Sequence, residues 1–486
     1  MVIPSPFPDL EIPEVPLTDF VLARAGEFGD KPALIDAATG RTISYAQLAE
    51  SVRAVAACLA ERGFGKGEVF AHHAPNLPEY AVAFHAVATV GGVNTTANPL
   101  LRAEELAAQL KDCSARFLVT VPELLEKASV AAQLASVEEI FVYGEVEGAT
   151  PFASLLEGGR VSPAAAIDPD QDLVALPYSS GTTGLPKGVM LTHRNLVANI
   201  CQTTGLFHTS EADRSIAVLP FFHIYGLVVI MNLVLGRGAT IVTMPRFELR
   251  EFLRVIQDYR ITRAAVVPPI VLALAKHALV DEFDLSSLKF VGSGVAPLSA
   301  ELEVACAKRL GCLVQQGYGL TETSPVTHTV PEDLAGQVPG SIGHAVPNTE
   351  CRIVDVATGE DSPTGEPGEL LIRGPQVMKG YLNNPHAIAL AIDPDGWLHA
   401  GDVARIEENG SLRIVDRIKE LIKYKGYQIA PAELEALLLT HPAIADAAVI
   451  PLPDQDAGEV PKAFVVPNGS ITPRERTAAM AGQARR

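Results

Sequence analysis

Cysteine is scarce in this sequence, and no two cysteines stand at the short spacing of a disulfide-rich or zinc-binding motif. Six cysteines are scattered over 486 residues without a CxxC pair. Because disulfide frameworks and zinc sites use closely spaced cysteines, we expect reduced, buried thiols. Residues 1–17 are acidic and proline-rich, with no basic stretch before an apolar one, so they do not predict a targeting peptide. Both observations indicate a cytoplasmic protein.

Positive charge and long uninterrupted apolar runs are also lacking. The chain has 38 lysines and arginines against 57 aspartates and glutamates, a net charge of −19, so a nucleic acid is not expected as a partner. An anionic nucleotide must then be bound by a local group of residues. The most apolar stretch, Ile216–Leu235, is interrupted by Pro220, His223, Gly226 and Asn232. This pattern predicts a buried strand, turn and helix rather than a membrane span.

Apolar residues are plentiful, and their spacing indicates the fold class. They make up 48% of the 486 residues, which is enough for a core spread over two or three structural units. Up to about residue 160, short β-rich runs alternate with amphipathic stretches, as in a parallel sheet covered by helices. One predicted helix begins with a capping box of Ser44 and Gln47 and ends at Gly63. Its apolar face is formed by Leu48, Val52, Val55 and Leu59.

The stretch SSGTTGLPKG, Ser179–Gly188, is rich in the groups that bind phosphate. It follows the apolar run Leu173–Pro177 and contains Lys187 together with the hydroxyls of Ser179, Ser180, Thr182 and Thr183. Glycines allow backbone amides to approach an anion, and the hydroxyls and the lysine can donate to its oxygens. The stretch is not a Walker A loop, because Pro186 stands where the second glycine is needed. The alternative is an ordinary surface loop rich in serine and glycine.

Several further strings occur with this loop in a fixed order, and together they resemble the adenylate-forming superfamily of acyl-CoA synthetases, amino-acid adenylation domains and luciferases. The strings are FVGSGVAPL (Phe290–Leu298), QQGYGLTET (Gln315–Thr323), GWLHAGD (Gly396–Asp402) and VDRIKELIKYKGYQIAPAELE (Val415–Glu435). PFFHIYGL (Pro220–Leu227) and the run that begins KELIKYKG are most similar to 4-coumarate–CoA ligases and their bacterial relatives. The resemblance covers roughly residues 30–467.

The resemblance implies an α/β fold in two parts. The first part, residues 1–418, is expected to hold layered parallel and mixed sheets with helices and a β-rich subdomain, with subdomains of about 1–170, 171–340 and 341–418. The second part, residues 419–486, is expected to be a small α+β domain. The sequence does not indicate an oligomeric state.

The resemblance also implies the reaction. A carboxylate attacks the α-phosphorus of ATP, pyrophosphate leaves, and the acyl-adenylate then gives a thioester with CoA; the alternative acceptor is the pantetheine arm of a carrier protein. Two anions must meet, so Mg²⁺, lysines and backbone amides are needed around the phosphates. The expected substrate is a cinnamate-like or fatty carboxylic acid. Two alternatives remain: a catalytically deficient protein that binds nucleotide and carboxylate, and an oxygenase of the luciferase type.

The family's nucleotide-binding residues can be transferred position by position. The resemblance implies that the phosphates are bound by Ser179, Ser180, Gly181, Thr182, Thr183, Gly184 and Lys187. Thr321 would contact the α-phosphate and Glu322 would bind Mg²⁺. The adenine site would be lined by Tyr318 and by the backbone of Gly294, Val295 and Ala296. Further cofactor-binding positions would be Ser293, Gln316, Gly317 and Gly319. For Glu322 the alternative is a solvated loop carboxylate.

The ribose, the substrate carboxylate and the acyl group have their own expected partners. Asp402 would accept hydrogen bonds from the ribose hydroxyls and Arg417 would reinforce it, although the two could equally form an ordinary ion pair. His223 would lie beside the substrate carboxylate, or would be a hydrogen-bonded core residue. The expected lining of the acyl pocket is His223, Tyr225, Gly294 and Gly317.

The last part of the chain has expected roles in switching between the two half-reactions. Lys419 matches the family's hinge. Lys423 and Gln428 match positions used in adenylation, and Lys425 and Gly426 match positions that approach CoA. For the lysines the alternative is an ordinary solvent-facing position.

The sequence departs from the family after the run Glu459–Val466. No lysine follows Lys462, whereas the family places a catalytic lysine near its C-terminus. We therefore expect an incomplete small domain that exposes apolar surface, and adenylation slowed by about a hundred- to thousandfold. Thioester formation from a supplied adenylate should be less affected. Truncation, an altered reading frame and genuine divergence all remain open.

Overall fold

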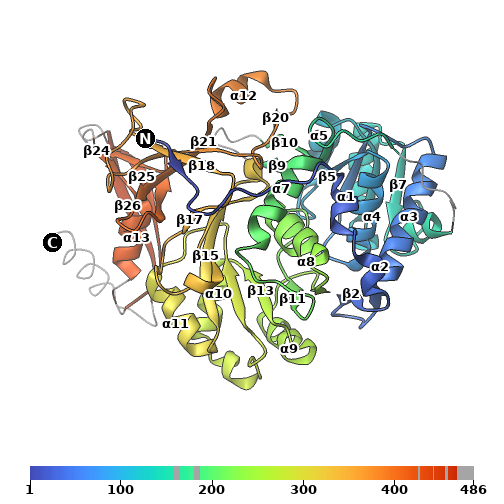
Figure 1. Ribbon diagram of the computed structural model, residues 1–486, viewed down its shortest axis with the longest axis horizontal. Coiled ribbons are helices and arrows are strands. Elements are labelled where there is room, and N and C mark those ends of the chain that lie inside the picture. The colour runs from blue at the N-terminus through green and yellow to red at the C-terminus, as the bar shows by residue number, and fades with distance from the viewer. Residues whose placement is uncertain are drawn as a thin grey trace. The chain divides into compact units, whose positions relative to one another are not determined.

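The computed structural model describes residues 1–157, 165–179, 186–424, 427–439, 441, 443–454 and 458–467 (Figure 1). The chain forms two compact units. The larger contains Ile3–Cys351 and Ile372–Leu398, and the smaller contains Met1–Val2, Arg352–Leu371 and the residues from His399 onward. The chain passes between the units within strands β18 (Glu350–Val354), β19 (Gly368–Arg373) and β21 (Leu398–Ile406). The expected domain and subdomain borders stay predictions.

The larger unit contains an eight-stranded sheet in the order β20-β10-β9-β5-β4-β6-β7-β8. From β9 to β8 all neighbouring strands are parallel, and β10 pairs antiparallel with β9 and with β20. The strands are β4 (Val69–His73), β5 (Val93–Thr96), β6 (Ala115–Thr120), β7 (Glu139–Val142), β8 (Thr150–Pro151), β9 (Leu173–Ser179), β10 (Lys187–Thr192) and β20 (Gly380–Tyr381). Its helices are α3 (Tyr45–Glu61), α4 (Pro78–Thr89), α5 (Ala103–Asp112), η1 (Pro122–Leu124), α6 (Leu125–Ala135), η2 (Phe152–Leu156), α7 (His193–Thr204) and α12 (Pro385–Ala391).

A nine-stranded sheet in the order β17-β16-β15-β14-β13-β11-β12-β2-β3 completes the frame of this unit. The strands are β2 (Pro32–Asp36), β3 (Thr42–Ser44), β11 (Arg214–Ala217), β12 (Thr240–Thr243), β13 (Arg263–Val266), β14 (Phe290–Ser293), β15 (Leu313–Gly319), β16 (Val326–Thr329) and β17 (His344–Ala345). The helices are α1 (Leu17–Val21), α2 (Ala25–Phe28), η3 (Tyr225–Asn232), α8 (Leu233–Gly236), α9 (Leu249–Tyr259), α10 (Pro268–Lys276), η4 (Ala278–Glu282), α11 (Ala300–Leu310), η5 (Thr321–Thr323) and η6 (Glu332–Leu334).

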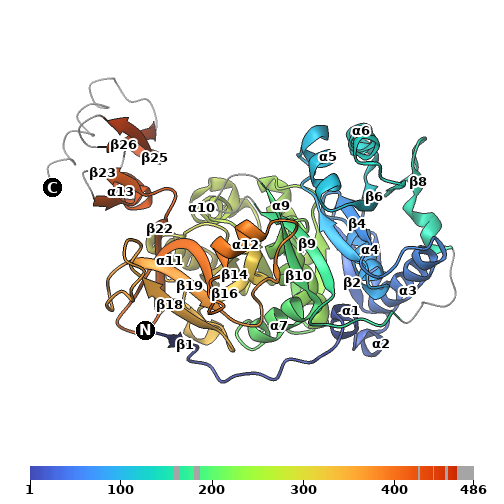
Figure 2. The same cartoon turned by 90° about the horizontal axis from the view of Figure 1, so that it is seen from above.

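The helices separate the core of the larger unit into two parts. One cluster of buried side chains holds α5 and α6 against the eight-stranded sheet. A larger cluster holds α3 and α4 against strands of both sheets, so the two sheets share this core (Figure 2). Burial of this apolar surface is the main source of stability for such layers.

The predicted N-terminal helix is confirmed. Helix α3 has Ser44 as its N-cap, and Ser44 and Gln47 form the reciprocal capping box. Gly63 follows the helix with a φ of 72°, the left-handed conformation that glycine adopts most easily. All four predicted apolar positions are buried, namely Leu48, Val52, Val55 and Leu59.

The apolar stretch Ile216–Leu235 also folds as predicted. It runs from the end of β11 through a turn into η3, a π-helix, and then α8. None of the helices in the described parts of the chain is long and apolar enough to cross a membrane.

The smaller unit is built mainly from antiparallel strands. Strand β21 pairs with β22 (Leu412–Arg417). A four-stranded sheet follows in the order β24-β23-β26-β25, formed by β23 (Ile422–Tyr424), β24 (Tyr427–Ile429), β25 (Ile444–Asp454) and β26 (Gly458–Pro467), and α13 (Pro431–Leu439) contacts β25. The remaining strand, β1 (Ile3–Pro4), belongs to the larger unit and pairs with β18 at Cys351 and Glu350. The predicted mixed α/β class, with a large first part and a small α+β last part, is confirmed.

Candidate active site

The predicted phosphate loop connects two paired strands. Ser179 is the last residue of β9, Lys187 is the first of β10, and the two lie opposite each other in the antiparallel register. Gly188 packs tightly here, because a Cβ at this position would lie 3.2 Å from the ring of Tyr178. The predicted loop residues between the strand ends lie outside the described residues: Ser180, Gly181, Thr182, Thr183 and Gly184.

Glu322 lies directly beside this hairpin. The hydroxyl of Ser179 donates to Glu322 Oε1 at 2.6 Å, and the hydroxyl of Tyr381 donates to the same oxygen at 2.8 Å. The carboxylate is buried, with 8% of the residue exposed. The structure therefore brings a predicted phosphate-binding residue and the predicted metal ligand together.

The chemistry of this carboxylate suits Mg²⁺. In nucleotide sites Mg²⁺ takes one or two protein carboxylates together with phosphate oxygens and water. Both hydrogen bonds to Glu322 reach Oε1, which among the described residues leaves Oε2 for another ligand. Those residues contain no group of three or more His, Cys, Asp or Glu side chains that could hold a metal by themselves. Glu322 would hold the ion with the phosphates of the nucleotide.

Lys187 is buried beside Tyr381, the tyrosine that donates to Glu322. Only 8% of it is exposed, and its Nζ lies 4.8 Å from the centre of the Tyr381 ring. Sequence reasoning missed Tyr381. Strand β20 has only two residues, too few to show any periodicity, so the sequence carried no local signal for it.

Thr321 and Glu322 begin η5, one residue after the end of β15, and the turn around them is tightly constrained. The Leu320 amide donates to Pro325 O at 3.1 Å, and the Thr323 hydroxyl donates to the same oxygen at 2.5 Å. Gly319 faces this oxygen, because a Cβ there would lie 2.0 Å from it. Only glycine can lie this close to the Pro325 carbonyl oxygen. This close contact sets the backbone position from which Thr321 and Glu322 follow.

The residues predicted to line the adenine site, and their predicted cofactor-binding neighbours, lie at the carboxyl ends of two neighbouring parallel strands. Ser293, the last residue of β14, pairs in register with Gln316 of β15. In α/β sheets ligands bind at this end of the strands. The residues at these strand ends are Ser293, Gly294, Val295 and Ala296 after β14, and Gln316, Gly317, Tyr318 and Gly319 in β15.

The Gln316 side chain holds a neighbouring loop in place by hydrogen bonds to its backbone. Its Oε1 accepts from the Leu298 amide at 2.9 Å and its Nε2 donates to Leu298 O at 3.1 Å. The loop that begins at Gly294 is therefore fastened to β15. Within it Val295 has a φ of 77° and is 58% exposed, unusual for a branched apolar residue.

His223 is fixed in one tautomer by its own turn. Its Nδ1 accepts a hydrogen bond from the Tyr225 amide at 3.2 Å. A backbone amide can only donate, so Nδ1 carries no proton and the neutral ring carries its proton on Nε2. Burial lowers the pKa of His223, which keeps the ring neutral near pH 7. His223 can therefore donate one hydrogen bond to a carboxylate.

The Asn76 side chain forms hydrogen bonds with the backbone of the segment just before His223. This residue was not predicted from the sequence. Its amide donates to Ala217 O at 2.9 Å and to Leu219 O at 2.8 Å, and its Oδ1 accepts from the Phe221 amide at 2.7 Å. The signal available in the sequence was a polar residue shortly after the buried strand β4.

Two of the predicted pocket residues meet. A Cβ at Gly294 would lie 3.2 Å from Cε1 of Tyr225, whose hydroxyl donates to Gly292 O at 3.3 Å. Gly317 lies against a different strand: a Cβ there would be 3.5 Å from His328 O. Tyr225 and Gly294 thus lie against each other, whereas Gly317 lies against β16.

In the smaller unit Asp402 and Arg417 lie opposite each other on β21 and β22. Arg417 Nε is 3.3 Å from Oδ1 of Asp402, whose side chain is buried. Lys419 is exposed in the turn that follows, where the Glu420 and Leu421 amides donate to Arg417 O. Lys423 and Gln428 pair in register on β23 and β24. Lys425 and Gly426 lie outside the described residues.

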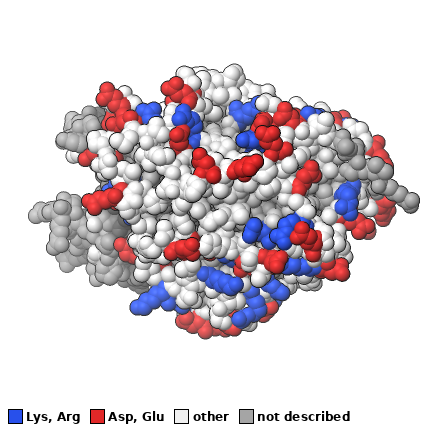
Figure 3. All heavy atoms as spheres, viewed as in Figure 1, with Lys and Arg blue, Asp and Glu red and all other residues white. Residues whose placement is uncertain are grey.

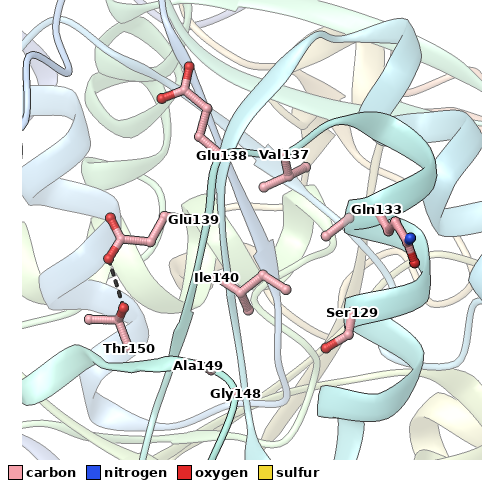
Figure 4. A pocket seen from close by; sticks show the side chains of 10 residues that line it. Ser129, Gln133, Val137, Glu138, Glu139, Ile140, Gly148, Ala149 and Thr150 are labelled. Carbon is pink, nitrogen blue, oxygen red and sulfur yellow. Dashed lines mark hydrogen bonds between the residues drawn. The ribbon is translucent and has the colours of Figure 1, made fainter.

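A separate pocket lies at the other edge of the eight-stranded sheet (Figure 4). It has a volume of ≈ 440 Å³ and is lined by α6, β7 and β8, where Thr150 donates to Glu139 at 2.7 Å. Strands β5, β4 and β6 separate β7 and β8 from the β9–β10 hairpin. None of the predicted site residues lines it.

Comparison with known proteins finds similar families and structures. The AMP-binding enzyme family matches residues 21–382, and the AMP-binding enzyme C-terminal domain matches residues 433–485. The 4-coumarate–CoA ligase of Pinus taeda is 44% identical over 485 residues, which cover 97% of this chain and 89% of that protein. ATP-bound MatB from Rhodopseudomonas palustris is 30% identical with a TM-score of 0.85, covering 95% of this chain and 92% of that one. The anthranilate CoA ligase AuaEII, in complex with anthranoyl-AMP, is 26% identical with a TM-score of 0.88, covering 98% and 92%.

The C-terminal match bears on one expectation from the sequence. We expected the small domain to lack its last segment and adenylation to be slow as a result. The match over residues 433–485 does not support a missing segment. The chain belongs to the AMP-binding enzyme family of adenylate-forming enzymes, and within it is similar to the 4-coumarate–CoA ligases.

Proposed function

We propose that this protein activates a carboxylic acid with ATP as an acyl-adenylate and transfers the acyl group to the thiol of CoA. The observation that carries the proposal is the position of Glu322, whose buried carboxylate accepts a hydrogen bond from Ser179 at the end of the predicted phosphate loop. The 4-coumarate–CoA ligase of Pinus taeda and the anthranilate CoA ligase support the same reaction class.

The residues around the hairpin suit the first half-reaction. A carboxylate oxygen forms a bond to the α-phosphorus, the bond to the bridging oxygen breaks, and pyrophosphate leaves. Lys187 offers a positive charge and Thr321 a hydroxyl to the phosphates, which reduces the repulsion between the two anions. Mg²⁺ bound by Glu322 would neutralise further charge on the phosphates.

His223 would orient the acid. In the tautomer set by Tyr225 it donates from Nε2, and a carboxylate accepts such a bond. Tyr225 and Gly294 would then line the acyl group. An aromatic acid of the cinnamate type is the proposed substrate class, because an aromatic ring can pack against the Tyr225 ring over Gly294.

The second half-reaction would use the smaller unit. The CoA thiol loses its proton and attacks the acyl carbonyl, and AMP leaves. We propose that Asp402, supported by Arg417, binds the ribose and that Lys419 is the hinge. Lys423 and Gln428 would serve adenylation, and Lys425 and Gly426 would approach CoA.

The experiment measures the two half-reactions separately. The purified chain is given Mg·ATP and a panel of cinnamic and fatty acids, and pyrophosphate release is followed. CoA consumption is followed in a second assay from synthetic acyl-adenylates. We expect both activities, with the cinnamic acids preferred.

The other outcomes are informative in different ways. Thioester formation with pyrophosphate release slower by a hundredfold or more would restore the expectation of impaired adenylation. ATP binding with neither activity would replace the proposal with a nucleotide-binding protein. Light emission from an adenylate in the presence of O₂ would indicate an oxygenase.

A further inference from the structure

Tyr381 contacts two of the predicted catalytic groups at once. Its hydroxyl donates to Glu322 Oε1 at 2.8 Å, and its ring lies 4.8 Å from the Lys187 ammonium. The residue is buried, with 5% exposed. Glu322 and Lys187 are 135 positions apart in the sequence, so one side chain connects two distant segments of the candidate site.

The backbone holds Tyr381 against the strand that begins with Lys187. Tyr381 pairs antiparallel with Val189, and the Leu382 amide donates to Gly188 O at 2.8 Å. Gly380 has a φ of 149°, and a Cβ there would lie 2.8 Å from the Ile388 side chain. The backbone at Tyr381 is therefore held by β10, by the turn at Gly380 and by α12.

Both contacts of Tyr381 are with charged groups, the Lys187 ammonium and the Glu322 carboxylate. An ammonium is attracted to the face of an aromatic ring, and a hydroxyl that donates to a carboxylate stabilises its charged form. A carboxylate can only accept, so the Tyr381 hydroxyl is the donor in its 2.8 Å contact with Glu322.

The two hydroxyls on Glu322 also determine its orientation. Ser179 and Tyr381 both donate to Oε1, and they come from different strands. A carboxylate held through one oxygen by two donors has little freedom to rotate. Its other oxygen then has a fixed direction, which a metal ion with strict octahedral geometry requires.

We propose that Tyr381 is a positioning residue for adenylation: it orients Glu322 toward the magnesium ion of Mg·ATP and holds the Lys187 ammonium beside the phosphates. This inference rests on the proposed function, because it assigns Tyr381 a task at the same nucleotide site. A purely structural tyrosine would affect stability without distinguishing Mg·ATP from ATP alone.

The test uses two variants of the full chain and a matched control. Tyr381→Phe keeps the ring over Lys187 and removes only the hydroxyl. Ser179→Ala removes the second hydroxyl from the same carboxylate oxygen. The control is Tyr45→Phe, because Tyr45 is also a buried tyrosine, with 1% exposed, and its hydroxyl donates to Ala239 O at 2.7 Å.

Binding of ATP with and without Mg²⁺ is measured by titration calorimetry, after thermal melting has shown that each variant is folded. We expect Tyr381→Phe to weaken Mg·ATP binding by about ten- to hundredfold, the size of a hydrogen bond to a charged group. Binding of ATP without Mg²⁺ should change by less than about threefold. Ser179→Ala should also weaken Mg·ATP binding, but because Ser179 belongs to the predicted phosphate loop it should weaken binding of ATP without Mg²⁺ as well. Tyr45→Phe should bind both forms like the unaltered protein.

Steady-state rates give a second readout. Tyr381→Phe should raise the Mg²⁺ concentration for half-maximal pyrophosphate release and leave the KM for the carboxylic acid unchanged. Equal loss of ATP binding with and without Mg²⁺, or no loss at all, would overturn the inference. If the unaltered protein binds Mg·ATP but releases no pyrophosphate, the proposed function fails, and the calorimetry still decides the role of Tyr381.

Discussion

At the scale of single residues, Glu322 connects parts of the chain that are far apart in sequence. Its Oε1 accepts hydrogen bonds from residues 143 and 59 positions away, and its backbone carbonyl accepts one from the Met378 amide. A buried carboxylate is costly unless it is hydrogen-bonded or paired with a cation. The two hydroxyls offset part of this cost, and a bound magnesium ion would offset more.

Replacing Glu322 with glutamine tests this dependence on charge. Glu322→Gln keeps the size of the side chain but removes the negative charge that a cation requires. We expect pyrophosphate release to fall by roughly a hundred- to thousandfold, the range for losing one preorganised charge at a transition state. Thioester formation from a supplied acyl-adenylate should fall much less, because no pyrophosphate is displaced in that step.

Glu282→Gln is the matched control, since Glu282 is an exposed carboxylate paired with Arg250 at the surface. It should leave both half-reactions within about twofold, as expected for an exposed ion pair. Equal losses in both half-reactions for Glu322→Gln would contradict a role specific to adenylation.

At the scale of elements, the signals that worked in the sequence were local. The helix at Tyr45–Glu61 could be predicted because its cap, its apolar face and its terminating glycine all lie within 20 residues. The apolar run Leu173–Pro177 before the phosphate loop was recognised for the same reason, and it lies in β9. The strand after the loop, β10, was not predicted from the sequence. Local patterns of this kind also predicted the buried strand, turn and helix at Ile216–Leu235.

The contacts that were missed are long-range. Asn76 holds a turn about 140 residues later through three hydrogen bonds, and Tyr381 reaches Glu322 from a strand of two residues. Neither has a spacing or a motif that reveals its partner, because the partner is set by sheet order. Sheet order was not readable from one sequence.

The turn between β15 and η5 gives a prediction at this scale. A Cβ at Gly319 would lie 2.0 Å from Pro325 O, whereas one at Gly317 would lie 3.5 Å from His328 O. Gly319→Ala must therefore move the backbone that positions Thr321 and Glu322, and Gly317→Ala fits the fold. We expect Gly319→Ala to lower the melting temperature and to abolish pyrophosphate release.

Gly317→Ala is the matched control for stability. It should melt within a few degrees of the unaltered protein, because a ΔΔG of about 1 kcal/mol shifts the melting temperature only slightly in a large chain. If Gly317 lines the acyl pocket as proposed, the variant should also raise the KM for bulky acids. Equal melting temperatures for the two variants would show that the contact at Gly319 does not constrain the turn.

At the scale of the whole molecule, the charged side chains are mixed. On the face shown in Figure 3, acidic and basic side chains are interspersed among the described residues, and the sequence carries a net charge of −19. An anionic nucleotide therefore gains little from the protein as a whole. Nucleotide binding must therefore depend on a few local groups such as Lys187. For this reason we expect a single substitution at the nucleotide site to cause a large loss of activity.

The buried histidines predict how the stability of the fold depends on pH. Burial lowers the pKa of five histidines from an ordinary value of 6.5 to about 4 for His72, His73 and His193 and to about 3 for His85 and His328. Below pH 6.5 the unfolded chain binds protons at these sites while the folded chain does not, so the free energy of unfolding falls as the pH falls. Each site contributes up to about 1.4 kcal/mol per pH unit.

Thermal melting between pH 7.5 and pH 4.5 tests this prediction. We expect the melting temperature to stay nearly constant down to about pH 6.5 and then to fall steeply toward pH 4.5. His72→Gln should reduce the slope, because it removes one site that only the unfolded chain protonates. A melting temperature that is independent of pH over the whole range would show that these side chains are not buried in their neutral form.

The most direct test of the reaction follows one oxygen atom. The preferred acid is labelled with ¹⁸O in its carboxylate, incubated with Mg·ATP, CoA and the protein, and the AMP released is analysed by mass spectrometry. Because the carboxylate oxygen attacks the α-phosphorus, we predict AMP that carries one ¹⁸O. Label in inorganic phosphate together with ADP, or AMP without label, would contradict activation of the acid as an acyl-adenylate.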